Sequence, residues 1–262
     1  METIGTVESL WRYPVKSMGG EQLKEAYLSF AGIYGDRLYA FRSETRPKGF
    51  PYLTGREQAQ MILFRPRFRH PDKAAMPPNL AEAQDIEPGL NPVFGDADDL
   101  AVEVQTPAGE VLAIDDEKLR RDLAKKREDP TVTLMRSDRA MTDCRPVSLF
   151  SIQTAHQLGA ELAMDLDKRR FRANVYLDLA GSCGFAEDRL VGRTVRIGSR
   201  TLLSILERDP RCAMITLDPE TGARNTDILG MVTEAHEGRA GVYAAVLVEG
   251  TVRIGDEVAV LD

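Results

Sequence analysis

The segment GVYAAVLVEGTVRIGDEVAVL, residues 241–261, decides the fold class. Its apolar residues form short β-favouring runs that are separated by glycine turns at Gly250 and Gly255. The segment TVRIGSRTLLSILE, residues 194–207, has the same order of strand, glycine turn and strand. Short strands that recur with such turns are typical of a β-sandwich or a β-barrel, so the C-terminal third is predicted to be one of these.

The N-terminal half also favours strands. Residues 23–44 predict a hairpin, because Ala26, Leu28 and Phe30 alternate with other residues before a Gly35-Asp36 turn. Other segments with strand character are residues 3–20, 60–68, 100–114, 129–138, 169–179 and 212–218.

Helices are expected to be few. Residues 115–128 and 154–164 each place two leucines one helical turn apart, which predicts two amphipathic helices. Residues 69–99 carry five prolines and little periodicity, so they are predicted to form a long surface loop. The chain is therefore expected to be mainly β with some α.

Composition excludes several classes of protein. With 43% hydrophobic and 29% charged residues among 262, the chain is expected to be globular, with one or two closely packed domains. A net charge of −7 argues against a nucleic-acid partner. No apolar run approaches the roughly 20 residues that span a bilayer, and no secretory leader is evident, so we expect no membrane association. Three widely spaced cysteines fit a reducing compartment, and we expect a cytoplasmic protein.

The segment ERDPRCAMITLDPETG, residues 207–222, holds the first candidate for chemistry. Cys212 directly follows Arg211 and lies four residues after Arg208, at a predicted entry from loop to strand. A thiolate binds metals or attacks substrates when nearby positive charge or a metal lowers its pKa. The alternative is a small core residue, because free cysteines are commonly buried.

A second set of candidates is cationic. Lys16 and Ser17 follow the Tyr-Pro-Val break, Arg37 follows a tight turn, and Arg172 and Asn174 are predicted to share one face of a strand. Taken singly, each of these residues has an alternative role, as a surface cation or, for Asn174, as a turn-capping amide. Together they predict a binding site for an oxyanion, in which the Asn174 amide would hydrogen-bond to a flat polar heterocycle.

These motifs resemble the MOSC family, named for the C-terminal domain of molybdenum-cofactor sulfurase. The resemblance rests on YPVKS, GDR, RFRAN, RCAMITLDPETG and the terminal GTVRIGDEVAVL, and it extends over nearly the whole chain. It is closest to two-domain members such as the mitochondrial amidoxime-reducing component. It implies a MOSC-type β-barrel packed against an N-terminal β-rich domain, with the N-terminal domain at residues 1–125 and the MOSC domain at residues 126–262.

The resemblance also implies a cofactor, the pyranopterin form of molybdenum (Mo-molybdopterin). Cys212 would be the protein thiolate on molybdenum. Arg211 would lie beside it. The remaining implied cofactor-binding residues are Lys16, Ser17 and Arg37 at the phosphate, and Arg172 and Asn174 at the pterin region.

The implied function is a molybdenum-dependent oxidoreductase that reduces N-hydroxylated small molecules. Asp209 is the candidate for a nearby proton relay, and its alternative role is to cap a turn before Pro210. No four-cysteine ferredoxin module follows, so electrons are expected from a separate ferredoxin, flavoprotein or cytochrome b5-like protein.

Two alternatives stay open. The chain could be a non-catalytic carrier that holds a persulfide, or the molybdenum cofactor itself, on Cys212. It could also bind another phosphorylated ligand, with an incidental thiol, but the long Arg-Cys motif would then have no explanation. Metal content separates the oxidoreductase from a persulfide carrier, because the persulfide carrier would hold sulfane sulfur without molybdenum. A site for another phosphorylated ligand would keep its binding in Cys212→Ser.

Overall fold

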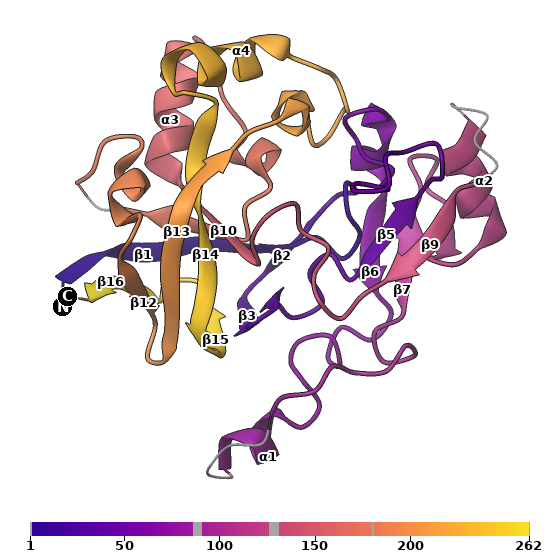
Figure 1. Cartoon of the computed structure of the whole chain (residues 1–262), viewed down its shortest axis with the longest axis horizontal. Coiled ribbons are helices and arrows are strands. Elements are labelled where there is room, and N and C mark those ends of the chain that lie inside the picture. The colour runs from indigo at the N-terminus through magenta and orange to yellow at the C-terminus, as the bar shows by residue number, and fades with distance from the viewer. Residues whose placement is uncertain (1, 86–90, 126–130, 180, 262) are drawn as a thin grey trace.

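The computed structural model describes residues 2–85, 91–125, 131–179 and 181–261. Figure 1 shows two β-rich regions side by side, one of which is a barrel covered at one end by helices α3 (Ile152–Glu161) and α4 (Thr226–Ala235). The other region carries helix α2 (Glu117–Lys125). The prediction of a mainly β chain, with a barrel packed against a second β-rich region, is confirmed.

Among the described residues, seven strands form a closed barrel in the spatial order β11, β10, β14, β13, β12, β16 and β1, and pairing of β11 with β1 closes it. Their bounds are β1 (Glu2–Arg12), β10 (Val147–Ser151), β11 (Val175–Asp178), β12 (Thr194–Ile197), β13 (Thr201–Pro210), β14 (Arg239–Val248) and β16 (Glu257–Leu261). Strands β10 and β11 are parallel. A parallel pair needs a crossover, and α3 with the short helix η2 (Lys168–Phe171) supplies it.

Alternation of side chains explains the barrel interior. In β12, Val195 and Ile197 are buried in the barrel core, while the alternating residues Thr194 and Arg196 are half-buried. Strand β10 is buried throughout because it has core on both faces. Its Leu149 packs in the barrel, and its neighbour Phe150 packs in a separate core beneath α3 and α4.

Among the described residues, the smaller region contains two short sheets, in the orders β5-β9 and β6-β7-β8. A third short sheet, β15-β3-β4, packs against the barrel, because its Ala26, Leu28, Ile33 and Val252 belong to the barrel core, and β2 extends the barrel sheet from β1. Their bounds are β2 (Glu21–Leu23), β3 (Glu25–Ser29), β4 (Gly32–Ile33), β5 (Tyr39–Arg42), β6 (Arg65–Phe68), β7 (Val102–Gln105), β8 (Val111–Ala113), β9 (Thr133–Arg136) and β15 (Gly250–Arg253). The core of the smaller region includes Tyr34, Phe41, Met61 and Leu119. The strand character expected at 100–114 is confirmed by the paired strands β7 and β8, the predicted helix beginning near residue 115 is confirmed by α2, and residues 126–128 of that helix lie outside the described residues.

The predicted hairpin over residues 23–44 is wrong in its pairing. Strand β3 pairs with β4 across a turn at Phe30 and Ala31, and β5 pairs with β9. Phe30 is 62% exposed, because it lies at this turn rather than inside a strand. The Gly35-Asp36 turn instead leads the chain away from β4 toward β5, in the smaller region.

Other expectations also need correction. Residues 60–68 divide into a short helix η1 (Ala59–Leu63) and β6, and the loop at 69–99 contains a short helix α1 (Leu80–Asp85). The predicted strand at 212–218 is mostly the 3-10 helix η4 (Ala213–Thr216). Helix α4 and the 3-10 helices η2 and η3 (Ala186–Leu190) were also not predicted, and η2 occupies the start of the predicted strand at 169–179. Asn225 begins α4 as its N-cap, with its side chain accepting a hydrogen bond from the Asp227 backbone N–H.

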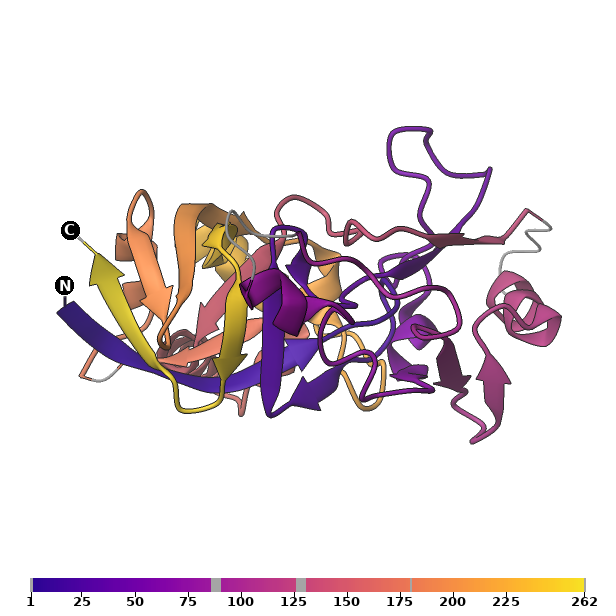
Figure 2. The same cartoon turned by 90° about the horizontal axis from the view of Figure 1, so that it is seen from below.

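The first and last strands of the barrel lie side by side, as Figure 2 shows for β1 and β16. The N-terminal strand thus belongs to a barrel whose other strands all follow residue 146. In the described part of the chain, no helix is long and apolar enough to cross a membrane.

Gly5 in β1 is a position where only glycine fits. A Cβ atom built there would lie 2.0 Å from the backbone oxygen of Asp178 in β11. We expect Gly5→Ala to lower the free energy of unfolding by about 1–3 kcal/mol, because the barrel closure must shift to admit a methyl group. Thermal unfolding measures this loss. The control is Gly49→Ala, where no atom lies within 4 Å of the added Cβ, and equal midpoints for the two variants would contradict the expectation.

Candidate functional site

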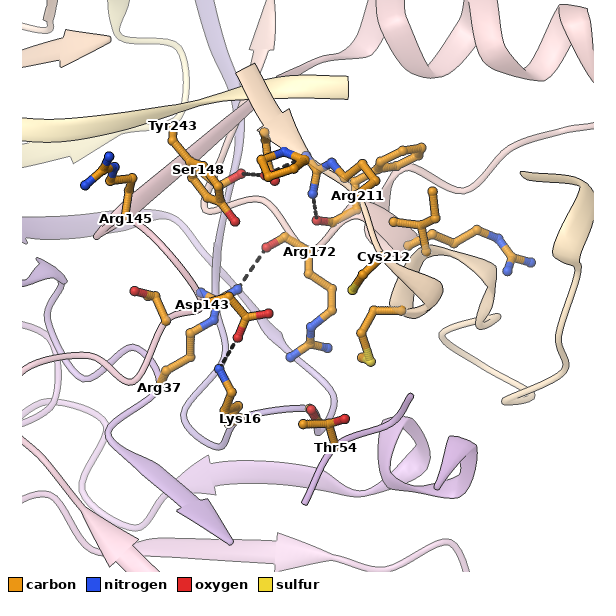
Figure 3. A pocket seen from close by; sticks show the side chains of 18 of the residues that line it. Lys16, Arg37, Thr54, Asp143, Arg145, Ser148, Arg172, Arg211, Cys212 and Tyr243 are labelled. Atoms are coloured by element: carbon orange, nitrogen blue, oxygen red, sulfur yellow. Dashed lines mark hydrogen bonds and ion pairs between the residues drawn. The ribbon is translucent and has the colours of Figure 1, made fainter. Parts of the chain in front are cut away.

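A pocket lies between the barrel and the smaller region, and Figure 3 shows its lining. Strand β1 leads into it from one side, and the end of β13 leads into it from the other. All the candidate site residues named from the sequence line this one pocket, namely Lys16, Ser17, Arg37, Arg172, Asn174, Asp209, Arg211 and Cys212. Residues that are up to 196 positions apart in the sequence therefore meet at one place.

Lys16 is buried in the pocket wall. Its Nζ donates a hydrogen bond to the backbone oxygen of Met141 at 2.8 Å and forms an ion pair with Asp143. The same ammonium lies 4.8 Å from the ring centroid of Tyr52 and 5.4 Å from that of Phe50. Burial lowers the pKa of Lys16 below its usual value, and Asp143 opposes that shift.

Arg37 and Arg172 both lie against the ring of Tyr13, with guanidinium carbons 4.7 and 4.2 Å from its centroid. Arg37 Nη2 donates to the backbone oxygen of Arg172 at 3.0 Å. Asp36 is paired with Arg37 and also accepts a hydrogen bond from the Tyr13 backbone N–H at 2.8 Å. Tyr13 and its charged neighbours thus join the end of β1 to the turn that carries Arg37.

Three of the candidate residues have left-handed backbone. Ser17, Arg37 and Arg172 have φ angles of 67°, 46° and 53°. Such conformations are costly for residues other than glycine and persist where the surrounding structure holds them, commonly at functional sites. The predicted shared strand face for Arg172 and Asn174 is therefore wrong, because Arg172 caps η2 and β11 begins only at Val175.

The Arg172 side chain has an unused donor. Its Nη1 donates to the backbone oxygen of Met18 at 2.7 Å, while its Nη2 is buried without a hydrogen-bond partner among the described residues. Burial lowers the pKa of Arg172 to about 10, and the neighbouring Arg37 acts in the same direction. A buried cation with a free N–H gains most from an anionic or acceptor group placed beside it.

Asn174 uses its amide within the fold. Its Oδ1 accepts from the Ser148 backbone N–H at 3.3 Å, and its Nδ2 donates to the backbone oxygen of Trp11 at 3.3 Å. Asn174 thereby ties β10 and β1 together beside β11.

Asp209 lies at the end of β13 with 1% of its surface exposed. Its Oδ2 accepts a hydrogen bond from Ser148 Oγ at 2.9 Å and forms an ion pair with Arg211 Nη2 at 2.9 Å. Its Oδ1 is buried without a hydrogen-bond partner in the described part of the chain. Burial raises the pKa of Asp209 above its usual value, and Arg211 opposes that shift.

Cys212 is half-buried and has a free thiol. It is the residue before η4, so the expected entry from loop to strand is in fact an exit from β13 into a 3-10 helix. Arg211 positions this junction, because its Nε and Nη1 donate to the backbone oxygens of Ala240 and Phe171 at 2.7 and 2.8 Å. In Figure 3 the sulfur of Cys212 lies on the Arg172 side of the pocket.

Sequence reasoning missed several residues of the lining. Asp143 and Arg145 lie in an irregular connection before β10, where no periodicity marks them. The other missed residues are Thr54, Arg56, Thr142, Ser148, Arg170, Phe171, Pro210, Met214, Ile215 and Tyr243. For Tyr243 a signal exists, because it is a polar aromatic within an otherwise apolar run.

The charge of the pocket contrasts with that of the chain. Its lining has seven cationic side chains and two carboxylates, whereas the whole chain has a net charge of −7. The cationic members are Lys16, Arg37, Arg56, Arg145, Arg170, Arg172 and Arg211. Arg37, Arg145 and Arg170 are also paired with carboxylates outside the lining, namely Asp36, Glu207 and Asp218. The buried guanidinium N–H of Arg172, which has no partner among the described residues, fits an anionic or acceptor ligand.

Two family models match this chain. The model of the MOSC N-terminal beta barrel domain matches residues 4–145, and the model of the MOSC domain matches residues 136–259. The chain is 26% identical to mitochondrial amidoxime reducing component 2 of Bos taurus over 241 residues, and 23% identical to that of Rattus norvegicus over 244. Each alignment covers 85% of this chain and 69% of the relative.

Among solved structures, the YUAD protein of Bacillus subtilis matches with a TM-score of 0.48 and 13% identity, over 98% of this chain and 96% of that one. The two family models together span both regions of the fold and every candidate residue in the pocket. The chain therefore belongs to the MOSC family, with a MOSC N-terminal beta barrel domain followed by a MOSC domain.

Proposed function

We propose that this chain is a molybdenum-cofactor-dependent oxidoreductase that reduces N-hydroxylated small molecules. The observation that carries the proposal is a half-buried thiol in a strongly cationic pocket with unpartnered donors. Membership of the MOSC family and similarity to two proteins named as amidoxime reducing components support it. An amidoxime is itself an N-hydroxylated compound.

The residues present fit the cofactor. A phosphate requires cations and hydrogen-bond donors, and Lys16, Ser17 and Arg37 offer both from the segments that follow β1 and β4. Arg172 adds a buried N–H that lacks a partner among the described residues. Cys212 supplies a soft sulfur ligand, which suits a metal that binds thiolates. When bound, the cofactor supplies the two-electron chemistry that the side chains cannot perform.

The proposed reaction requires a source of electrons and a source of protons. Reduction of an N-hydroxyl group breaks the N–O bond, consumes two electrons and two protons, and releases the oxygen as water. We assign the electrons to a separate donor protein of the ferredoxin, flavoprotein or cytochrome b5-like class. We propose that the carboxyl of Asp209 holds one of these two protons. Its burial favours the protonated form, and its Oδ1 lacks a partner in the described part of the chain.

The first test is the metal content of protein made in a host that synthesises the cofactor. We expect molybdenum and pterin to copurify with the chain in equal amounts, and Cys212→Ser to lose the molybdenum, because an alcohol is a poor ligand for a thiolate-binding metal. Elemental analysis and pterin fluorescence measure both. Cys183→Ser, at an exposed cysteine outside the pocket, should retain the metal.

Two results would contradict the proposal. Equal molybdenum in the wild type and in Cys212→Ser would show that the thiol is not the ligand. Sulfane sulfur on Cys212 without molybdenum would favour a persulfide carrier instead.

The second test removes one charge from the expected phosphate site. Lys16→Met keeps the length of the side chain, and we expect it to weaken binding of inorganic phosphate by about 10- to 150-fold, the range for one lost charged hydrogen bond. Equilibrium dialysis with labelled phosphate measures the affinity. Lys48→Met, at an exposed lysine that does not line the pocket, is the matched control, and equal affinities in both variants would count against this site.

A further inference from the structure

Asp209 is closed off from solvent, although the proposed reaction draws a proton from it at each turnover. Only 1% of its surface is exposed, and its Oδ1 has no hydrogen-bond partner in the described part of the chain. A carboxyl that does not meet bulk water regains its proton only through a neighbouring group.

Two hydroxyl-bearing side chains stand on the strands beside Asp209. Ser148 in β10 and Tyr243 in β14 form a cross-strand pair. The residues on either side of them in the sequence all belong to the barrel core, namely Val147, Leu149, Val242 and Ala244. Because side chains alternate along a strand, Ser148 and Tyr243 share the opposite face of the sheet. Figure 3 shows the two side by side at one wall of the pocket, with the Tyr243 hydroxyl pointing into it.

Asp209 lies where the pairing of β13 with β14 is irregular. The register shifts between Arg208 and Pro210, and Gly241 on the partner strand has a left-handed backbone with a φ angle of 77°. A β-bulge of this kind re-aims a side chain out of the regular ladder. The carboxyl of Asp209 thereby meets the hydroxyl-bearing pair, and its Oδ2 accepts a hydrogen bond from Ser148 Oγ at 2.9 Å.

Tyr243 connects this buried carboxyl to the rim of the pocket. It is half-buried, and its hydroxyl interacts with the Asp209 carboxyl. It also interacts with Asp143 and Cys144, which are exposed in the irregular segment before β10. Burial raises the pKa of Tyr243, and Asp209 acts in the same direction, so the hydroxyl stays protonated. The titratable and charged groups around Asp209 and Tyr243 include Arg37, Arg211, Asp143 and Cys144.

We propose that Tyr243 passes protons from water at the rim of the pocket to the carboxyl of Asp209, while Ser148 holds that carboxyl in place. The inference rests on the proposed function and adds the route by which Asp209 regains its proton. After Asp209 gives up its proton, Tyr243 Oη gives its own to Oδ1 and takes one from water in the same step. The transfer is concerted, because a buried tyrosinate beside a carboxylate would be strongly disfavoured. Both side chains thus return to their starting state, and water supplies the proton.

Hydrogen exchange at Asp209 tests this route directly. The holoprotein is transferred from H2O to D2O at a pH where Asp209 is protonated, and infrared spectroscopy follows the carbonyl band of its carboxyl. Asp209→Asn, which lacks that band, identifies it. Tyr243→Phe keeps the ring and loses only the hydroxyl, and we expect it to slow the exchange by about 100-fold, the lower end of what a positioned proton donor contributes.

Tyr27→Phe is the matched control. The Tyr27 hydroxyl also interacts with a carboxylate, that of Glu249, but Tyr27 does not line the pocket. The exchange at Asp209 in this variant should be as fast as in the wild type.

Turnover provides a second measurement. With benzamidoxime as the substrate and reduced methyl viologen as the electron donor, Tyr243→Phe should lower kcat by a similar factor and leave KM unchanged. The reason is that the hydroxyl acts on Asp209 rather than on the substrate. The solvent deuterium isotope effect on kcat should rise in this variant, because the supply of protons becomes limiting.

The outcomes separate this inference from the proposed function. Equal exchange rates in Tyr243→Phe and Tyr27→Phe, or an unchanged kcat in Tyr243→Phe, overturn the inference even if molybdenum copurifies with the chain. Slower exchange in Tyr243→Phe alone supports the route to Asp209 even if the protein reduces no N-hydroxylated compound, a result that would count against the proposed function only.

Discussion

The pairing of β1 with both β11 and β16 is the constraint on which the rest of the structure depends. It closes the barrel, since β11 and β16 would otherwise be its open edges. It also fixes where the chain goes after Arg12, because the next residues run directly from the barrel into the pocket. Lys16 and Ser17 consequently line the same pocket as Cys212, although that residue follows nearly 200 positions later.

The pocket concentrates positive charge in an acidic protein. Arg172 donates to the backbone oxygen of Met18 and has no carboxylate partner among the described residues, whereas Arg211 donates to the backbone oxygens of Ala240 and Phe171 and is also paired with Asp209. A carbonyl oxygen orients a guanidinium without neutralising it, so the positive potential remains available to a ligand. Lys16 and Arg37 differ from Arg172, because Asp143 and Asp36 partly compensate their charges, and a bound anion would compete with those carboxylates.

Left-handed backbone at Ser17, Arg37 and Arg172 places three polar side chains where regular strands could not. Each lies just outside a strand or short helix and is held by neighbouring contacts, such as the Arg37 N–H donating to the Tyr13 backbone oxygen at 2.7 Å. Such conformations persist only where the surrounding structure holds them in place.

The amino-acid sequence alone determined the strand-rich class, the helix that begins near residue 115, and the residue types of the pocket, because periodicity and short motifs are local properties of the chain. It could not determine which strands pair, as the 23–44 hairpin shows. It could not reveal Asp143 either, since nothing in its irregular segment distinguishes it. Those features depend on contacts between distant residues, and only closure of the barrel by β1 brings such residues together.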